Sequence, residues 1–185
     1  MKKNNKGIST VATIITVAVI TLAVIGAVLW ITFGGKEFSE GYDTGNGYEN
    51  EWAGLRFEVP QNYKFQGKNR QPNGSVQFLY ADPMGNVIGI SVSEQRVKDF
   101  DKESEKEVKA LENLFKAAGL KLTSKIGQER LLGKKYNCCY TTGEGIRQDL
   151  LIRNVGRKGS IMLLFQIVNG TSADMEKLKS LVKKY

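Results

Sequence analysis

The hydrophobic and polar positions divide the chain into an apolar amino-terminal segment and a longer patterned region. Residues 8–33 contain no charged side chain, whereas the later sequence places its apolar residues in short runs between glycine-containing turns. An uninterrupted apolar run of 26 residues is typical of a membrane-spanning helix, and alternating runs are typical of half-buried strands. We therefore expect an anchored chain whose carboxyl-terminal part folds by itself.

The apolar segment is long enough to cross a bilayer. As a helix it would extend about 39 Å, more than the roughly 30 Å of a hydrocarbon core, and it exceeds the about 7–15 apolar residues of a secretory signal. Three lysines precede it, whereas its other flank is mixed in charge. The positive-inside rule then predicts a cytoplasmic basic tail over residues 1–7, a single transmembrane helix from Ile8 to Phe33, and an extracytoplasmic remainder.

Small and hydroxyl side chains gather on one side of this predicted helix. Such residues let two membrane helices approach closely and hydrogen-bond, so the segment carries a candidate helix–helix face for self-association. The alternative is that these hydroxyls bond to their own backbone and contact no partner. The residues of the candidate face are Thr10, Thr13, Thr21, Ala23 and Ala27.

The pair Lys6-Gly7, followed by the apolar run that begins at Ile8, is similar to the start of archaeal-type pilins and related prepilin-like proteins. That resemblance implies cleavage after Gly7 and an exposed Ile8 at the head of a hydrophobic stem. Ala12 stands where bacterial type IV pilins have a glutamate. A pilin-like subunit processed after Gly7 is therefore the alternative to a permanent anchor.

Glycine and polar residues over 34–51 predict a flexible stalk, and the folded domain is expected over 52–185. Leu55, Phe57 and Val59 alternate with polar residues, which predicts a half-buried strand over 54–60. Two further strands are predicted at 76–80 and 87–92, joined by the turn sequence Asp82–Asn86, and residues 61–74 are expected to form a polar loop.

The hydrophobic period changes from two to about 3.6 over residues 103–118, which predicts an amphipathic helix with a capping box from Ser104 to Glu107. Beyond it, apolar runs between glycine turns predict four antiparallel strands and a last helix with an apolar stripe. These strands span 121–131, 134–142, 146–155 and 159–168, and the stripe runs from Met175 to Tyr185. Because residues 161–168 are almost wholly apolar, their strand is expected to be central and covered on both faces.

This order predicts an α+β fold, a single antiparallel sheet of about six or seven strands flanked by two helices, behind one amino-terminal transmembrane helix. The run GLRFEVPQNY, from Gly54 to Tyr63, resembles the opening of PsbP-like domains, with Tyr63 in place of the more frequent tryptophan. In layout the similarity covers residues 52–185. The resemblance implies a mostly noncatalytic role, as an accessory subunit or assembly factor of a membrane complex.

Composition excludes several kinds of chemistry. The chain has no histidine, which removes the commonest general base and most catalytic zinc sites. Its 27 basic and 19 acidic side chains are spread along the chain without a recognised motif, so no nucleic-acid partner is expected. Cys138 and Cys139 are adjacent and point to opposite faces of a predicted strand, which favours small apolar core residues over a redox or lipidated pair.

No pair of carboxylates has a spacing that acid–base catalysis would require. Solvated faces and caps explain the acidic candidates, which are Asp82, Asp99, Asp101, Glu144 and Asp149. We therefore expect no enzyme, no cofactor and no metal site. The sequence favours a cell-membrane protein with an extracytoplasmic domain that binds an unidentified membrane or cell-surface protein, its other partner being the lipid bilayer. A membrane-anchored enzyme is the third alternative, after the pilin-like subunit.

Overall fold

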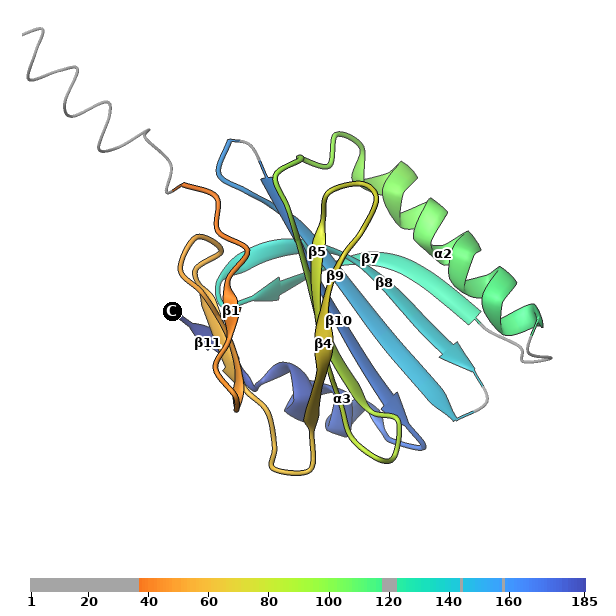
Figure 1. The fold of residues 1–185 in the computed structure, drawn as a ribbon. Helices are drawn as coiled ribbons and strands as arrows, with labels where there is room; N and C mark the ends of the chain where they lie inside the picture. Colours follow the sequence, from red (N-terminus) through yellow and green to blue (C-terminus); the bar gives the residue numbers. More distant parts are fainter. Residues whose placement is uncertain (1–36, 118–122, 144, 158) are drawn as a thin grey trace, which may run out of the picture. The chain divides into compact units, whose positions relative to one another are not determined.

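The computed structural model describes residues 37–117, 123–143, 145–157 and 159–185. These residues form two antiparallel sheets and two helices (Figure 1). The smaller sheet has four strands in the spatial order β1-β2-β3-β11. Its strands are β1 (Tyr42–Asp43), β2 (Gly47–Asn50), β3 (Leu55–Glu58) and β11 (Val182–Lys184).

The larger sheet has seven strands, each antiparallel to its neighbours. In spatial order they are β4 (Lys64–Arg70), β5 (Val76–Ala81), β6 (Val87–Ser93), β10 (Gly159–Val168), β9 (Ile146–Val155), β8 (Lys134–Gly143) and β7 (Thr123–Leu131). Strand β10 lies between β6 and β9, and its Phe165 is 0% exposed. The predicted central position of this strand is confirmed.

The inner face of the seven-stranded sheet packs against the four-stranded sheet and against helix α3 (Ser172–Lys179). Aromatic rings join the two sheets: the ring of Tyr48 lies 4.9 Å from that of Phe78, and the ring of Phe57 lies 5.4 Å from that of Tyr80. Helix α2 (Phe100–Ala117) lies on the outer face, where it contacts β7 and β8. The inner face of the large sheet therefore has a full covering layer, whereas α2 covers only part of the outer face.

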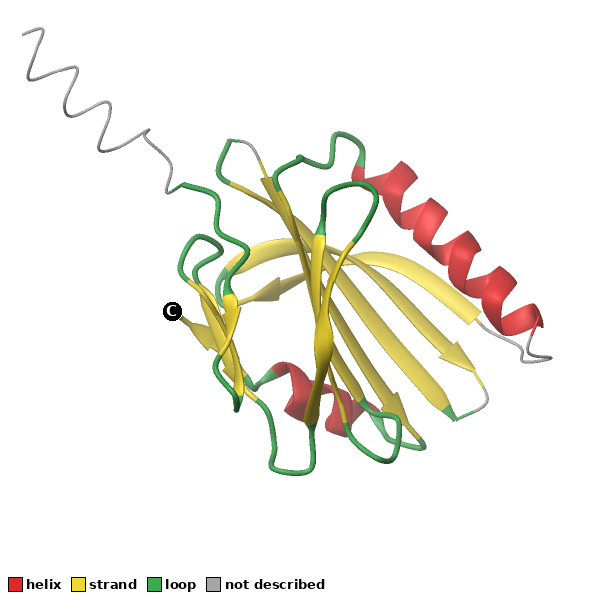
Figure 2. Ribbon diagram, viewed as in Figure 1, coloured by secondary structure: helices red, strands yellow, loops and turns green. Residues whose placement is uncertain are grey.

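The expected α+β fold with a single sheet is wrong. Strands make up most of the described chain, as Figure 2 shows, because segments predicted as stalk, loop and helix contribute β1, β2, β4 and β11. The expected transmembrane helix is not one of the described helices. Over residues 37–117, 123–143, 145–157 and 159–185, no helix has the length and apolar character to cross a membrane. The segment from Ile8 to Phe33 lies outside these ranges.

Residues 37–51, most of the expected stalk, are built into the domain. Tyr48 is 0% exposed, and its hydroxyl donates to the carbonyl of Glu40 over 2.6 Å. The side chain of Asn50 donates to the carbonyl of Ser39 over 2.9 Å. A Cβ atom on Gly47 would lie 1.9 Å from the carbonyl oxygen of Phe57. Gly47 is therefore needed for the close pairing of β2 with β3. The glycine that suggested a flexible stalk serves the packing of the sheet instead.

The last predicted helix is shorter than its apolar stripe. It begins at Ser172, where Thr171 and Asp174 form a capping box, but it ends at Lys179. Val182 then pairs with Phe57, so β11 supplies hydrogen-bond partners to an edge of β3 that would otherwise be open. Backbone pairing therefore overrides the helical period of the apolar residues.

Helix α2 occupies the predicted region but begins earlier. The carboxylate of Asp99 accepts a hydrogen bond from the backbone N–H of Lys102 over 3.0 Å, as an N-cap does. Ser104 lies within the helix, so the predicted capping box at Ser104 is wrong. The early start places the first turn of α2 beside the end of β6.

Candidate functional site

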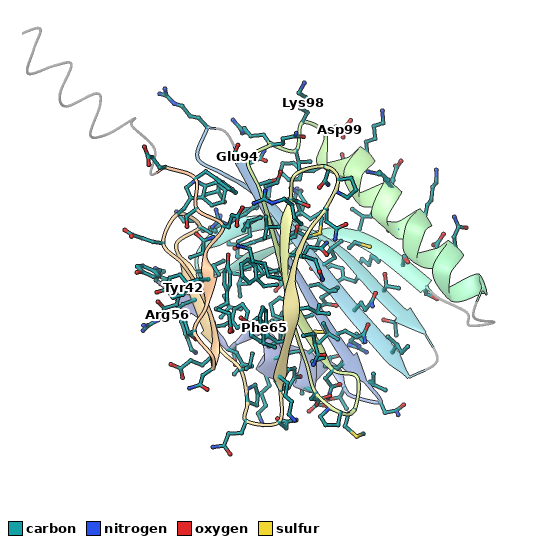
Figure 3. The ribbon with its side chains drawn as sticks, viewed as in Figure 1. Tyr42, Arg56, Phe65, Glu94, Lys98 and Asp99 are labelled. Carbon is teal, nitrogen blue, oxygen red and sulfur yellow. The ribbon has the colours of Figure 1, made fainter. Side chains whose placement is uncertain are left out.

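A broad groove lies on the outer face of the seven-stranded sheet beside α2, with a volume of about 1180 Å³. Strands β5, β6 and β10 provide its floor, and the first turns of α2 form one wall. The opposite wall comes from the β4–β5 hairpin, residues 71–75. Figure 3 shows Lys98 and Asp99 at the amino-terminal end of α2, with Glu94 in the loop before them.

Strand register arranges the outward-facing residues of the floor in rows that cross the sheet. Successive rows are Ser93–Ser160–Asn154, then Gln77–Ser91–Met162–Ile152, then Leu79–Gly89–Leu164–Leu150. The first row is polar, the second is mixed and the third is apolar. The chemistry of the floor therefore changes from hydroxyl and amide groups to aliphatic groups along the strands.

An apolar cleft of about 180 Å³ continues the groove and shares Met162 with it. At its floor, a Cβ atom on Gly89 would lie 3.3 Å from atoms of Leu164 and Leu79, so the glycine lets these two leucines approach each other over β6. Met162 and Leu164 are only half-buried, whereas Leu163, which points to the inner face, is 0% exposed. Strand β10 was expected to be covered on both faces. The structure covers it completely on the inner face but only partly on the outer face.

Charged side chains on the wall of the groove are mostly basic. Asp99 is engaged in capping α2, which leaves its charge close to the helix amino terminus. The basic residues that line the groove are Arg96, Lys98, Lys102, Lys106 and Lys109, and the acidic ones are Asp99 and Glu105. Lys102, Lys106 and Lys109 follow the spacing of one helix face. This wall therefore presents a predominantly positive surface to whatever occupies the groove.

A second polar cluster is buried where α3 meets the inner face of the sheet. The Nζ atom of Lys179 lies 2.6 Å from Asp149, 2.8 Å from Glu129 and 3.2 Å from Glu176. Lys179 is 3% exposed and Asp149 is 5% exposed. The hydroxyl of Tyr140 donates to Glu129 over 3.2 Å. The ammonium group thus joins α3 to β7 and β9, and β8 is linked to it through Glu129.

The electrostatics of this cluster suit a structural role. Burial lowers the pKa of Lys179, but its hydrogen bonds to Asp149 and Glu129 outweigh burial and hold that pKa above the ordinary range. Burial raises the pKa of Asp149, against the opposing effect of Lys179. A lysine that remains protonated cannot act as a base or nucleophile. None of these side chains lines either groove described above. The interpretation of Asp149 as a solvated residue is wrong.

The two cysteines point to opposite faces, as the strand pattern predicts. Cys138 belongs to the main core and Cys139 to the smaller core under α2, and neither forms a disulfide. Burial raises the pKa of the Cys138 thiol to about 11, so this thiol is protonated and unreactive near neutral pH. Their interpretation as small core residues is confirmed.

The other predicted positions fall into two groups. The carboxylate of Asp82 accepts hydrogen bonds from the N–H groups of Met84 and Asn86 over 2.9 Å, which confirms a turn residue, and Asp101 is exposed. Outside the described residues lie Glu144, the candidate processing site Gly7, the ends of the predicted span Ile8 and Phe33, and the candidate face Thr10, Thr13, Thr21, Ala23 and Ala27. In the part of the chain that the structure describes, no cluster of acidic and cysteine side chains could hold a metal ion.

Comparison with known proteins adds little. No family model matches the chain, and no curated protein matches it. A crystal structure from Bacteroides thetaiotaomicron VPI-5482 is similar at 16% identity and a TM-score of 0.38, covering 71% of this chain and 45% of that one. The chain thus spans less than half the length of that protein, and a likeness of this size carries no argument. The resemblances to PsbP-like domains and to pilins remain predictions.

Proposed function

We propose that this protein is a noncatalytic accessory protein of the cell membrane, whose extracytoplasmic domain binds a protein partner in the groove beside α2. The location rests on the sequence, from the uncharged residues 8–33 and the basic residues before them. One structural observation carries the binding role: Met162 and Leu164 on the central strand are only partly buried on the floor of an open groove.

Two further observations support binding over catalysis. Among the residues that the structure describes, amide, hydroxyl, aliphatic and basic side chains line the groove, with Asp99 and Glu105 as its carboxylates, and Asp99 already caps α2. The buried carboxylates around Lys179 are paired with that lysine and lie on the other face of the sheet. An apolar surface rimmed by polar groups is the usual form of a protein-binding site.

Isolating the protein together with its partner from membranes would test the proposal. Full-length protein would be solubilised from membranes of its own cells with mild detergent, and its particle size would be measured by native electrophoresis. We expect the native chain to migrate with a partner and Leu164→Glu to migrate alone, because a charge on the floor would have to be desolvated upon binding. Leu164 is partly buried and packs against the small core under α2, so the variant must first show the circular dichroism spectrum and cooperative thermal transition of the native chain.

Met84→Glu is the matched control, because Met84 is 64% exposed in the β5–β6 turn, away from the residues that line the groove. This variant should migrate like the native chain. The proposal fails if the native chain already migrates alone, or if Leu164→Glu and Met84→Glu have the same effect.

A further inference from the structure

We infer that the groove binds an amphipathic helix of another protein, which lies on the uncovered half of the sheet and carries acidic side chains on the flank facing α2. This inference rests on the proposed function and specifies the chemistry of the partner. Three features support it: the incomplete outer layer of the sheet, the size of the groove and the charge of its wall.

Helix α2 already shows how a helix packs on this face. Val97 and Phe100 at its start, with Val108, pack against Cys139, Leu150 and Ile152. The same apolar row continues across the sheet through Leu164, Gly89 and Leu79, beyond the strands that α2 contacts. A second helix beside α2 would complete the layer and cover the half-exposed side of β10.

The dimensions suit one helix. Strands β5, β6 and β10 leave a width of about 14 Å at the usual strand spacing, and a helix with its side chains is about 10–12 Å across. Three turns of such a helix displace about 1,300–1,800 Å³, so a groove of about 1180 Å³ would hold most of one helix and leave its outer side in solvent. A partner strand would need an open sheet edge, whereas this surface is the face of three paired strands.

Charge determines which helix would fit. Lys98, Lys102 and Lys109 are exposed along the α2 wall. A helix with glutamate or aspartate on the adjoining flank would pair with them, while a basic helix would be repelled. Its opposite flank would contact the amide and hydroxyl groups of Gln77 and Ser91. Such a helix therefore needs an apolar stripe with acidic residues to one side.

Other ligands fit less well. No aromatic side chain is among the described residues that line the larger groove, so a sugar ring would find no stacking surface there. A lipid chain would need an apolar slot, but the apolar cleft measures only about 180 Å³ and the rest of the floor is half polar. An acidic amphipathic helix uses the polar, apolar and basic parts of the site together.

Photo-crosslinking in living cells tests the inference with the full-length chain. A benzoylphenylalanine in place of Leu164 would report on the groove. One in place of Tyr185, which is 55% exposed and follows β11 on the four-stranded sheet, would report background. The adduct would be isolated from membranes and the crosslinked peptide mapped by mass spectrometry. We expect a peptide from a different protein, with an apolar period near 3.6 and acidic residues on one flank.

Charge reversal supplies the second readout. Lys102→Glu together with Lys109→Glu should lower the yield of this adduct about tenfold, because two attractive contacts become repulsive. Lys134→Glu with Lys135→Glu is the matched control, since both lysines are exposed at the start of β8 and neither lines the groove. This pair makes the same change in net charge and should leave the yield unchanged.

The outcomes separate the two proposals. An adduct no stronger at position 164 than at 185 overturns both the groove and its proposed occupant. A partner peptide that is basic or forms a strand would contradict the acidic helix but not the protein-binding groove. The same holds if Lys102→Glu with Lys109→Glu does not lower the adduct yield. An adduct with lipid, glycan or a second copy of this chain also overturns the inference.

Discussion

Lys179 holds three carboxylates at the junction of α3 with the seven-stranded sheet, and its replacement should reveal how much the fold depends on it. In Lys179→Met the methionine would fill similar space, but Asp149 and Glu129 would lose their cation. An uncompensated buried charge costs about 3–5 kcal/mol. We expect a loss of that size in the free energy of unfolding at pH 7, measured by urea denaturation.

The pH dependence of this variant has a definite sign. Burial raises the pKa of Asp149 in the folded chain, so its folded form takes up a proton more readily than the unfolded form. The stability that comes from protonating Asp149 is fully present below the pKa that Asp149 has in the unfolded chain. It is lost as the pH rises through the pKa that Asp149 has in the folded chain. Lys179→Met should therefore recover part of its loss on acidification from pH 7 to pH 5. Lys177→Met, at an exposed position on α3, should change stability by less than about 0.5 kcal/mol. Equal losses in the two variants would contradict the structural role of Lys179.

At the level of elements, the central strand β10 makes a sharp prediction. Phe165 is 0% exposed on the inner face, between Ile88 on β6 and Asp149 on β9. Phe165→Asp would bury a second carboxylate next to Asp149, at a cost comparable to the whole stability of a domain, about 5–15 kcal/mol. We expect no cooperative thermal transition by circular dichroism. Phe165→Leu keeps an apolar side chain and should remain folded, and a folded Phe165→Asp would show that β10 is not central.

The accuracy of the sequence-based prediction varies from element to element for physical reasons. Strands β5, β6, β8, β9 and β10 have apolar patterns of period two and helix α2 has one of about 3.6, and these local signals agree with the tertiary structure. Strands β1, β2 and β11 are short, and β4 is polar and exposed along an edge, so their pairing depends on neighbours distant in the sequence. The same limit applies to Lys179, whose partners come from three elements, and to the groove. Its existence depends on strand register and on how far α2 extends across the sheet.

For the whole molecule, the main correction concerns where the folded domain begins, and two shortened forms of the chain would test it. The composition predicts that residues 34–51 can be removed without loss, whereas the structure places Tyr48 in the core and pairs β2 with β3. The hydroxyl of Tyr80 donates a hydrogen bond to the carbonyl of Gly47 over 2.6 Å, and removing residues 34–51 would remove that acceptor. Burial raises the pKa of Tyr80, so this hydroxyl would remain protonated and without that partner.

We therefore expect the chain of residues 37–185 to unfold cooperatively on heating, and the chain of residues 52–185 to bind a hydrophobic dye and lack a cooperative transition. Tyr48→Ala in the longer form isolates the packing effect, and loss of a buried aromatic ring should cost about 3–5 kcal/mol. Tyr42→Ala is its matched control, because Tyr42 lies on the same small sheet but is 55% exposed. If residues 52–185 unfold at the same temperature as residues 37–185, the amino-terminal strands are dispensable and the stalk interpretation is restored. If only the longer form folds, the domain extends into the segment whose glycines suggest flexibility.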